Sequence, residues 1–64
     1  MLPIQITLTP TMVTFENLEE NVAENIEHGE VKINEHGKYY VKGDEKTLFK
    51  LLLELSYNYD IEIG

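Results

Sequence analysis

Two histidines, His28 and His36, are the side chains of this sequence that titrate near neutral pH. His28 lies four residues after Glu24, a spacing that places two metal-ligating side chains on one face of a helix. A stable metal site needs three or four ligands in a fixed geometry, and the spacing supplies no third ligand. We therefore interpret His28 as a residue favoured by the negative end of a helix, and we predict no metal site.

Nucleophilic catalysis needs an activated nucleophile beside a base and a group that orients this base. The single serine, Ser56, lies in an apolar segment with no histidine near it in the sequence. The four glycines are isolated from one another, which excludes a glycine-rich phosphate-binding loop. The sequence therefore predicts no catalytic residue and no cofactor. A small enzyme that uses a carboxylate or histidine base is the less favoured alternative.

Residues 16–30 contain six glutamates and no lysine or arginine. At about 100° per residue, four of these glutamates fall within roughly 80° on one face of a helix. These four are Glu16, Glu20, Glu24 and Glu27. One interpretation is a solvated face that keeps a small protein soluble. The other is a binding surface for a basic protein. In the most specific version of this interpretation, the partner is a DNA-binding protein, and the carboxylates occupy its nucleic-acid site.

The whole chain of 64 residues carries a formal net charge of −7 and contains no arginine. Its five lysines are interleaved with acidic residues in the second half of the chain, so direct contact with nucleic acid or with an anionic membrane is not predicted. No apolar run approaches the roughly 20 residues that cross a bilayer, and the N-terminus lacks the cationic start of a signal peptide. We therefore expect a cytoplasmic protein whose partner is another protein.

The first predicted element is a strand over residues 2–8, where apolar and polar side chains alternate. Its apolar members are Leu2, Ile4, Ile6 and Leu8. Pro10 ends the strand because proline cannot donate a hydrogen bond to a sheet ladder. Residues 10–15 fit a strand, a loop or the first turn of a helix.

A first helix is predicted to begin near residues 14–17 and to end at Gly29. Asn17 and Glu20 have the spacing of a capping box, in which the side chains at both positions bond to free backbone amides at the helix start. Apolar residues recur at steps of three and four along this segment, which predicts one buried helical stripe. The stripe consists of Phe15, Leu18, Val22 and Ile26.

A hairpin is predicted around residues 35–37, where Gly37 suits the left-handed position of a three-residue turn. The register that this turn selects places the apolar side chains on one face and an acid opposite a lysine on the other. The expected pairs are Ile33 with Tyr39, Val31 with Val41, and Glu30 with Lys42.

A second helix is predicted between Asp44 as its N-cap and Asn58 as a left-handed stop, followed by a final strand over residues 59–63. The apolar arc of this helix spans roughly 200°, about twice the width that one packing face needs. The residues left on one flank are Phe49, Leu53 and Tyr57. They either pack against the first helix or form the interface of a homodimer or a groove for a partner.

The predicted order is strand, helix, strand, strand, helix, strand over one domain, residues 1–64. This order resembles the split βαβ arrangement of ferredoxin-like domains, which implies an α+β fold with an antiparallel sheet and two helices on one face. We expect a small acidic, non-enzymatic binding protein that inhibits or regulates another protein. Phages and mobile elements carry proteins of this kind. The most specific version of this hypothesis is that the protein mimics the charge of a nucleic acid. A structural subunit of a homo-oligomer is the alternative.

Overall fold

The alternating residues near the start of the chain form strand β1 (Ile4–Thr9), in which Ile4 and Ile6 are buried and the intervening Gln5 is exposed. The computed structural model describes residues 3–64, so Leu2 lies outside the described residues. A tight turn at residues 10–11 leads into strand β2 (Met12–Phe15), which pairs antiparallel with β1. Residues 10–15 are therefore a turn followed by a strand.

Helix α1 (Glu20–Glu24) is only five residues long, so the predicted start near residues 14–17 is wrong. Its N-cap is Glu19, which makes no side-chain capping bond. The side chain of Asn17 instead accepts the backbone N–H of Gln5 at 2.7 Å and donates to the carbonyl of Pro3 at 2.9 Å. The predicted capping residue therefore closes the end of the β1–β2 hairpin.

The apolar stripe predicted for one long helix is divided between three kinds of structure. Phe15 belongs to β2, and the other three side chains are half-buried against the same core from α1 and from the loops before and after it. α1 ends at Glu24, so the predicted end at Gly29 is also wrong. Gly29 has a φ of +90° and lies in the loop that leads to strand β3 (Val31–Ile33).

The predicted hairpin is confirmed between β3 and strand β4 (Tyr39–Lys42), with Val31 paired to Val41 and Ile33 to Tyr39. Gly37 has a φ of +77°, as the turn requires. The ladder stops at the pair of Val31 and Val41, before the expected pair of Glu30 and Lys42. Lys42 pairs instead with Met12 of β2.

Helix α2 (Glu45–Asn58) starts as predicted, because Asp44 accepts the backbone N–H of Thr47 at 2.8 Å. Asn58 is its last residue but is not left-handed, since within residues 3–64 only glycines have positive φ. Tyr59 is extended and leads into strand β5 (Ile61–Ile63). α2 buries Leu48, Leu51 and Leu55 against the sheet.

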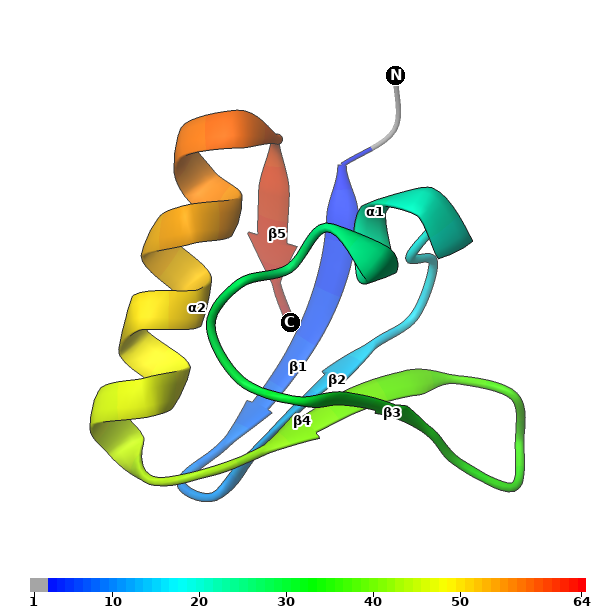
Figure 1. Cartoon of the computed structure of the whole chain (residues 1–64), viewed down its shortest axis with the longest axis horizontal. Helices are drawn as coiled ribbons and strands as arrows, with labels where there is room; N and C mark the ends of the chain where they lie inside the picture. Colours follow the sequence, from blue (N-terminus) through cyan, green and yellow to red (C-terminus); the bar gives the residue numbers. More distant parts are fainter. Residues whose placement is uncertain (1–2) are drawn as a thin grey trace.

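The sheet has five strands in the order β3-β4-β2-β1-β5. It is mixed, because β5 runs parallel to β1 while the other neighbours are antiparallel. The α+β class holds, but the purely antiparallel sheet is wrong and the ferredoxin-like order is not found, because β2 adds a strand that pairs with β1 as a hairpin. Figure 1 shows α2 beside β5 and β1, with the β3–β4 hairpin at the opposite side.

One face of the sheet carries the core, and both helical segments pack against that face. The sheet contributes Ile4, Ile6, Val13, Phe15 and Val41 to the fully buried cluster. Five strands at about 4.8 Å spacing span roughly 19 Å, which is wider than the ~10 Å diameter of one helix. Because α2 and the five-residue α1 do not cover the whole width of the sheet, side chains of the core face such as Ile63 of β5 remain exposed.

Candidate protein-contact surfaces

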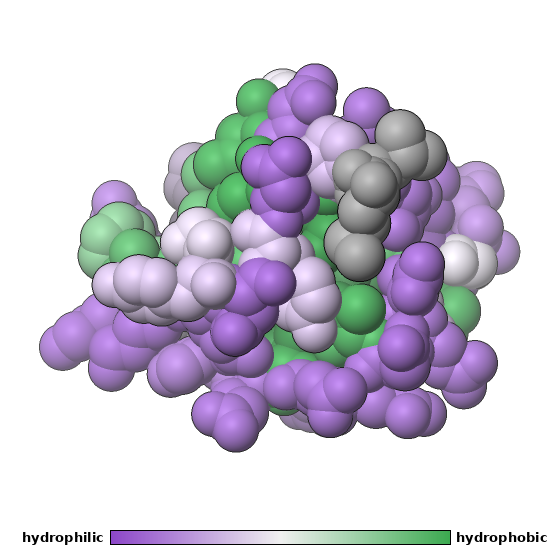
Figure 2. Space-filling view, turned by 90° about the horizontal axis from the view of Figure 1, so that it is seen from above, coloured by the Kyte–Doolittle hydropathy of each residue, from purple (hydrophilic) through white to green (hydrophobic). Residues whose placement is uncertain are grey.

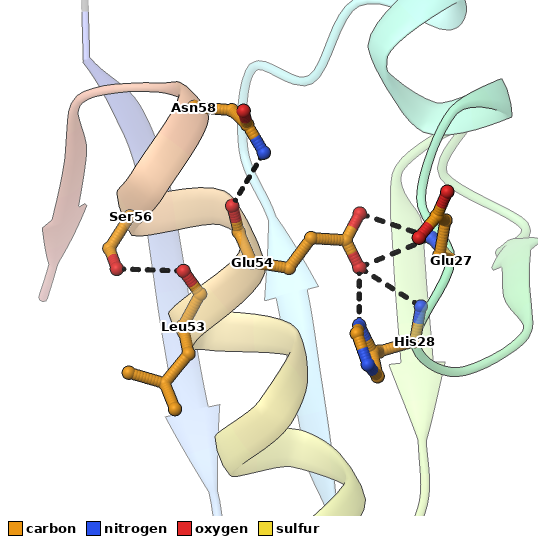
Figure 3. Close-up of polar contacts among 6 residues, drawn as sticks. All are labelled: Glu27, His28, Leu53, Glu54, Ser56 and Asn58. Atoms are coloured by element: carbon orange, nitrogen blue, oxygen red, sulfur yellow. Dashed lines mark hydrogen bonds and ion pairs between the residues drawn. The ribbon is translucent and has the colours of Figure 1, made fainter.

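Glu54 of α2 holds the loop that follows α1 (Figure 3). Its carboxylate accepts the backbone N–H of Glu27 at 3.1 Å and that of His28 at 3.0 Å. Nδ1 of His28 lies 2.7 Å from the same carboxylate, in the position of a donor. The side chain of Glu54 is 15% exposed, so these three bonds replace most of its contact with water. His28 is therefore a partner of α2 and does not share a helix with Glu24.

Burial raises the pKa of the Glu54 carboxyl, but the hydrogen bonds from the His28 side chain and from the two backbone amides together outweigh burial, so the net pKa is lowered. A carboxyl group whose pKa is lower in the folded than in the unfolded protein stabilises the fold at pH values above its pKa in the unfolded protein. This contribution is lost as the pH falls through the folded pKa.

Glu54→Gln is expected to reduce the free energy of unfolding by about 1.5–3 kcal/mol at pH 7, the usual range for hydrogen bonds to a charged group. As the pH falls through the lowered pKa of Glu54, the difference between wild type and variant should shrink, because the wild-type carboxyl then becomes protonated. Urea unfolding over a series of decreasing pH values measures this, with Glu35→Gln at the exposed hairpin tip as the control. A difference that stays constant over the whole series would contradict this role of the charge.

The four glutamates of the predicted acidic stripe are exposed but do not share one helix face. Glu20 and Glu24 are the first and last residues of α1, and Glu27 lies in the following loop. Glu16 follows β2, and its carboxylate forms an ion pair with Lys38 of the hairpin. The single helix face is therefore wrong, because the helix that was to carry it spans only five residues.

The outer face of α2 exposes three large apolar or aromatic side chains at four-residue steps. Phe49 is 61% exposed, Leu53 39% and Tyr57 82%. Figure 3 shows Leu53 leaving α2 on the side opposite Glu54 and His28, which face the α1 segment. These side chains do not pack against α1, so of the two interpretations of this flank, packing against the first helix is wrong.

An apolar groove of about 440 Å³ lies between the first half of α2 and the β1–β2 turn. Its walls are Leu8, Thr9 and Pro10 on one side and Glu45, Leu48, Phe49 and Leu52 on the other. Leu8 is 43% exposed although its place in the alternation of β1 predicts burial. Ile63 of β5 is likewise 52% exposed on the core face of the sheet. The alternation identified their face correctly but not the incomplete cover over that face.

Apolar surface therefore gathers on the side of the molecule that carries α2 and β5. Figure 2 shows it in the upper left of a view from above, with hydrophilic atoms along the lower edge. We call the exposed side chains of this side the α2–β5 surface; they are Leu8, Phe49, Leu53, Tyr57 and Ile63. Sequence reasoning identified the three members on α2 and missed the two on the strands.

Within residues 3–64, no three histidine, aspartate or glutamate side chains gather into a group that could hold a metal ion. Neither helix in this part of the chain is long and apolar enough to cross a membrane. Compared with known protein families, curated proteins and solved structures, the chain gives no match.

Proposed function

We propose that this chain is a small non-enzymatic binding protein that inhibits or regulates another protein by direct contact. The observation that carries the proposal is the exposure of Phe49, Leu53 and Tyr57 along one face of α2. Burying apolar surface favours association, and aromatic side chains are common anchors of protein interfaces. A contiguous apolar surface on a small domain is typical of a contact site.

The groove beside Phe49 adds a place where a partner side chain can be enclosed. Its walls are mostly apolar, and among residues 3–64 Glu45 is the one ionisable residue that lines it. Such a groove suits an aliphatic or aromatic side chain of a partner, with Glu45 at its edge accepting a hydrogen bond or pairing with a cation. Surface and groove together favour recognition of a protein.

A second candidate function is the imitation of nucleic-acid charge by residues 16–30. The observation that favours it is the exposure of all six glutamates of this segment, of which Glu16 alone forms an ion pair with a lysine within residues 3–64. The carboxylates extend over the end of β2, α1 and the following loop rather than along one helix face. A basic partner that docks here would contact a curved acidic surface.

The two candidates are separated by capture from the native host with three forms of the protein. The first is the wild type, the second carries Phe49→Ser with Leu53→Ser, and the third carries glutamine at Glu20, Glu24 and Glu27. We expect the partner captured by the wild type to be lost from the second form and retained by the third. Loss from the third form alone would contradict the α2 face and support charge mimicry, because removal of charge weakens steering and ion pairs.

A further inference from the structure

Strand β5 leaves one row of backbone groups unused at the edge of the sheet. The N–H of Ile4 donates to the carbonyl of Asp60 at 2.8 Å, and the N–H of Gly64 donates to the carbonyl of Ile6 at 2.9 Å. In a parallel ladder alternate residues bond to the neighbour, so Ile61 and Ile63 turn their N–H and C=O groups away from β1. Since β5 is the last strand in the sheet order, these groups face the outside of the sheet.

The side chains of β5 differ in character on the two faces of the sheet. Ile61 and Ile63 lie on the core face, where they pair with Ile4 and Ile6 of β1, and Ile63 is 52% exposed. Figure 1 shows α2 next to β5. Glu62 lies on the opposite face and is exposed. A strand added beside β5 would therefore meet apolar side chains on one face and a carboxylate on the other.

We propose that the edge of β5 accepts an extended segment of a basic partner as a sixth strand. Apolar side chains at alternate positions of that segment enter the space between β5 and the exposed flank of α2. Lysines or arginines at the intervening positions lie beside Glu62. This inference rests on the proposed function, because the α2–β5 surface is the contact surface in both, and it adds the conformation and the charge of the bound segment.

Charge distinguishes this occupant from a second copy of the chain. An antiparallel pair of β5 strands places Glu62 of one copy opposite Glu62 or Asp60 of the other, or leaves both acids close to the shared edge. Like charges that face each other across strands are destabilising, and acidic side chains on an edge strand oppose pairing between copies. Each copy also carries a net charge of −7. A basic strand gains from the same carboxylates.

The other edge of the sheet, strand β3, differs from β5 both in its charge and in its distance from the apolar flank of α2. β3 carries Lys32 on the open face, where it would repel a basic strand. Its exposed apolar residue, Ile33, lies far from the apolar flank of α2, since β3 and β5 are opposite ends of the sheet order. The preference of a basic strand for β5 is therefore a prediction of the proposal.

The experiment uses a soluble seven-residue peptide of alternating lysine and valine with blocked ends, titrated against the whole protein by calorimetry. We expect binding of this peptide and none of a peptide with glutamate in place of lysine. Glu62→Lys should weaken binding at least about tenfold, because it exchanges attraction for repulsion across strands. Glu35→Lys, the same charge change at the distant hairpin tip, should leave the affinity within about twofold by the same reasoning.

Backbone pairing is tested by Ile63→Pro, which removes the outward N–H without removing a bond to β1, and by a peptide N-methylated on alternate residues. Both changes should abolish binding, with thermal unfolding showing that Ile63→Pro is still folded. If N-methylated and parent peptides bind equally, the association is electrostatic only and strand addition is overturned. The proposal would also be overturned if the protein self-associates and Glu62→Lys makes this self-association stronger. The edge of β5 would then bind a second copy of the chain. Neither of these two results would overturn the proposed function. That function is tested separately, by whether the Phe49→Ser, Leu53→Ser double variant loses the host partner.

Discussion

Gly29→Ala is expected to reduce the free energy of unfolding by about 2–4 kcal/mol, from backbone strain and overpacking together. Gly29 has a φ of +90°, where L-residues are strained, and a Cβ built on it would lie 2.6 Å from Cγ1 of Val41. Val41 is completely buried in the middle of the core, so its side chain has no space to move into. Both costs therefore apply at this position.

Gly37→Ala is the matched control, because Gly37 has a φ of +77° but no atom within 4 Å of the position of its Cβ. We expect a loss of about 1 kcal/mol, from strain alone. Urea unfolding followed by circular dichroism at pH 7 measures both variants. Equal losses in the two variants would show that the loop at Gly29 does not pack against Val41 in solution.

Phe15→Ala is expected to cost about 3–5 kcal/mol, since it leaves a cavity in the core. Phe15 is 1% exposed in β2, between the strands that supply the other buried side chains. A chain of 64 residues has a total stability of roughly 3–10 kcal/mol at the usual value per residue. The variant should therefore be partly or largely unfolded without denaturant.

Phe49→Ala is the control of the same chemistry, and we expect it to cost less than about 1 kcal/mol because Phe49 is 61% exposed. Thermal unfolding of the two variants side by side makes the comparison. A cost at Phe49 that approaches the cost at Phe15 would place Phe49 in the core. The outer face of α2 would then be part of what holds the fold together and would not be available to a partner.

The parts of the fold that could be predicted from the sequence are those set by neighbouring residues. The hairpin of β3 and β4 follows from Gly37 and from two short alternating segments that select one register. The start of α2 follows from Asp44, whose carboxylate bonds three residues ahead in the chain. In both cases every group that decides the structure lies within a few residues.

The first half of the chain could not be predicted in the same way. Val13 and Phe15 alternate as a strand requires, but Phe15, Leu18 and Val22 also recur at helical spacing. The strand forms because β2 pairs with β1 on one side and with β4 on the other, and β4 is more than twenty residues away. Only these distant partners decide between the two patterns.

In the candidate contact surface, too, some residues could be predicted from the local sequence and others depend on distant parts of the chain. Phe49, Leu53 and Tyr57 could be found because the apolar arc of α2 is wider than one packing face. Leu8 and Ile63 could not, since alternation predicts both to point inward, and their exposure depends on how much of the sheet α2 covers. The bonds between Glu54 and His28 join residues 26 apart, and no local pattern indicates them.

The central claim is that the exposed face of α2 binds another protein. Its most direct test is calorimetric titration of the captured host partner with the wild type and with the Phe49→Ser, Leu53→Ser double variant. We expect the double variant to bind at least about 30-fold more weakly, the loss that corresponds to one interface hot spot, while its thermal unfolding stays close to that of the wild type. Equal affinity of the two proteins for this partner would contradict the claim.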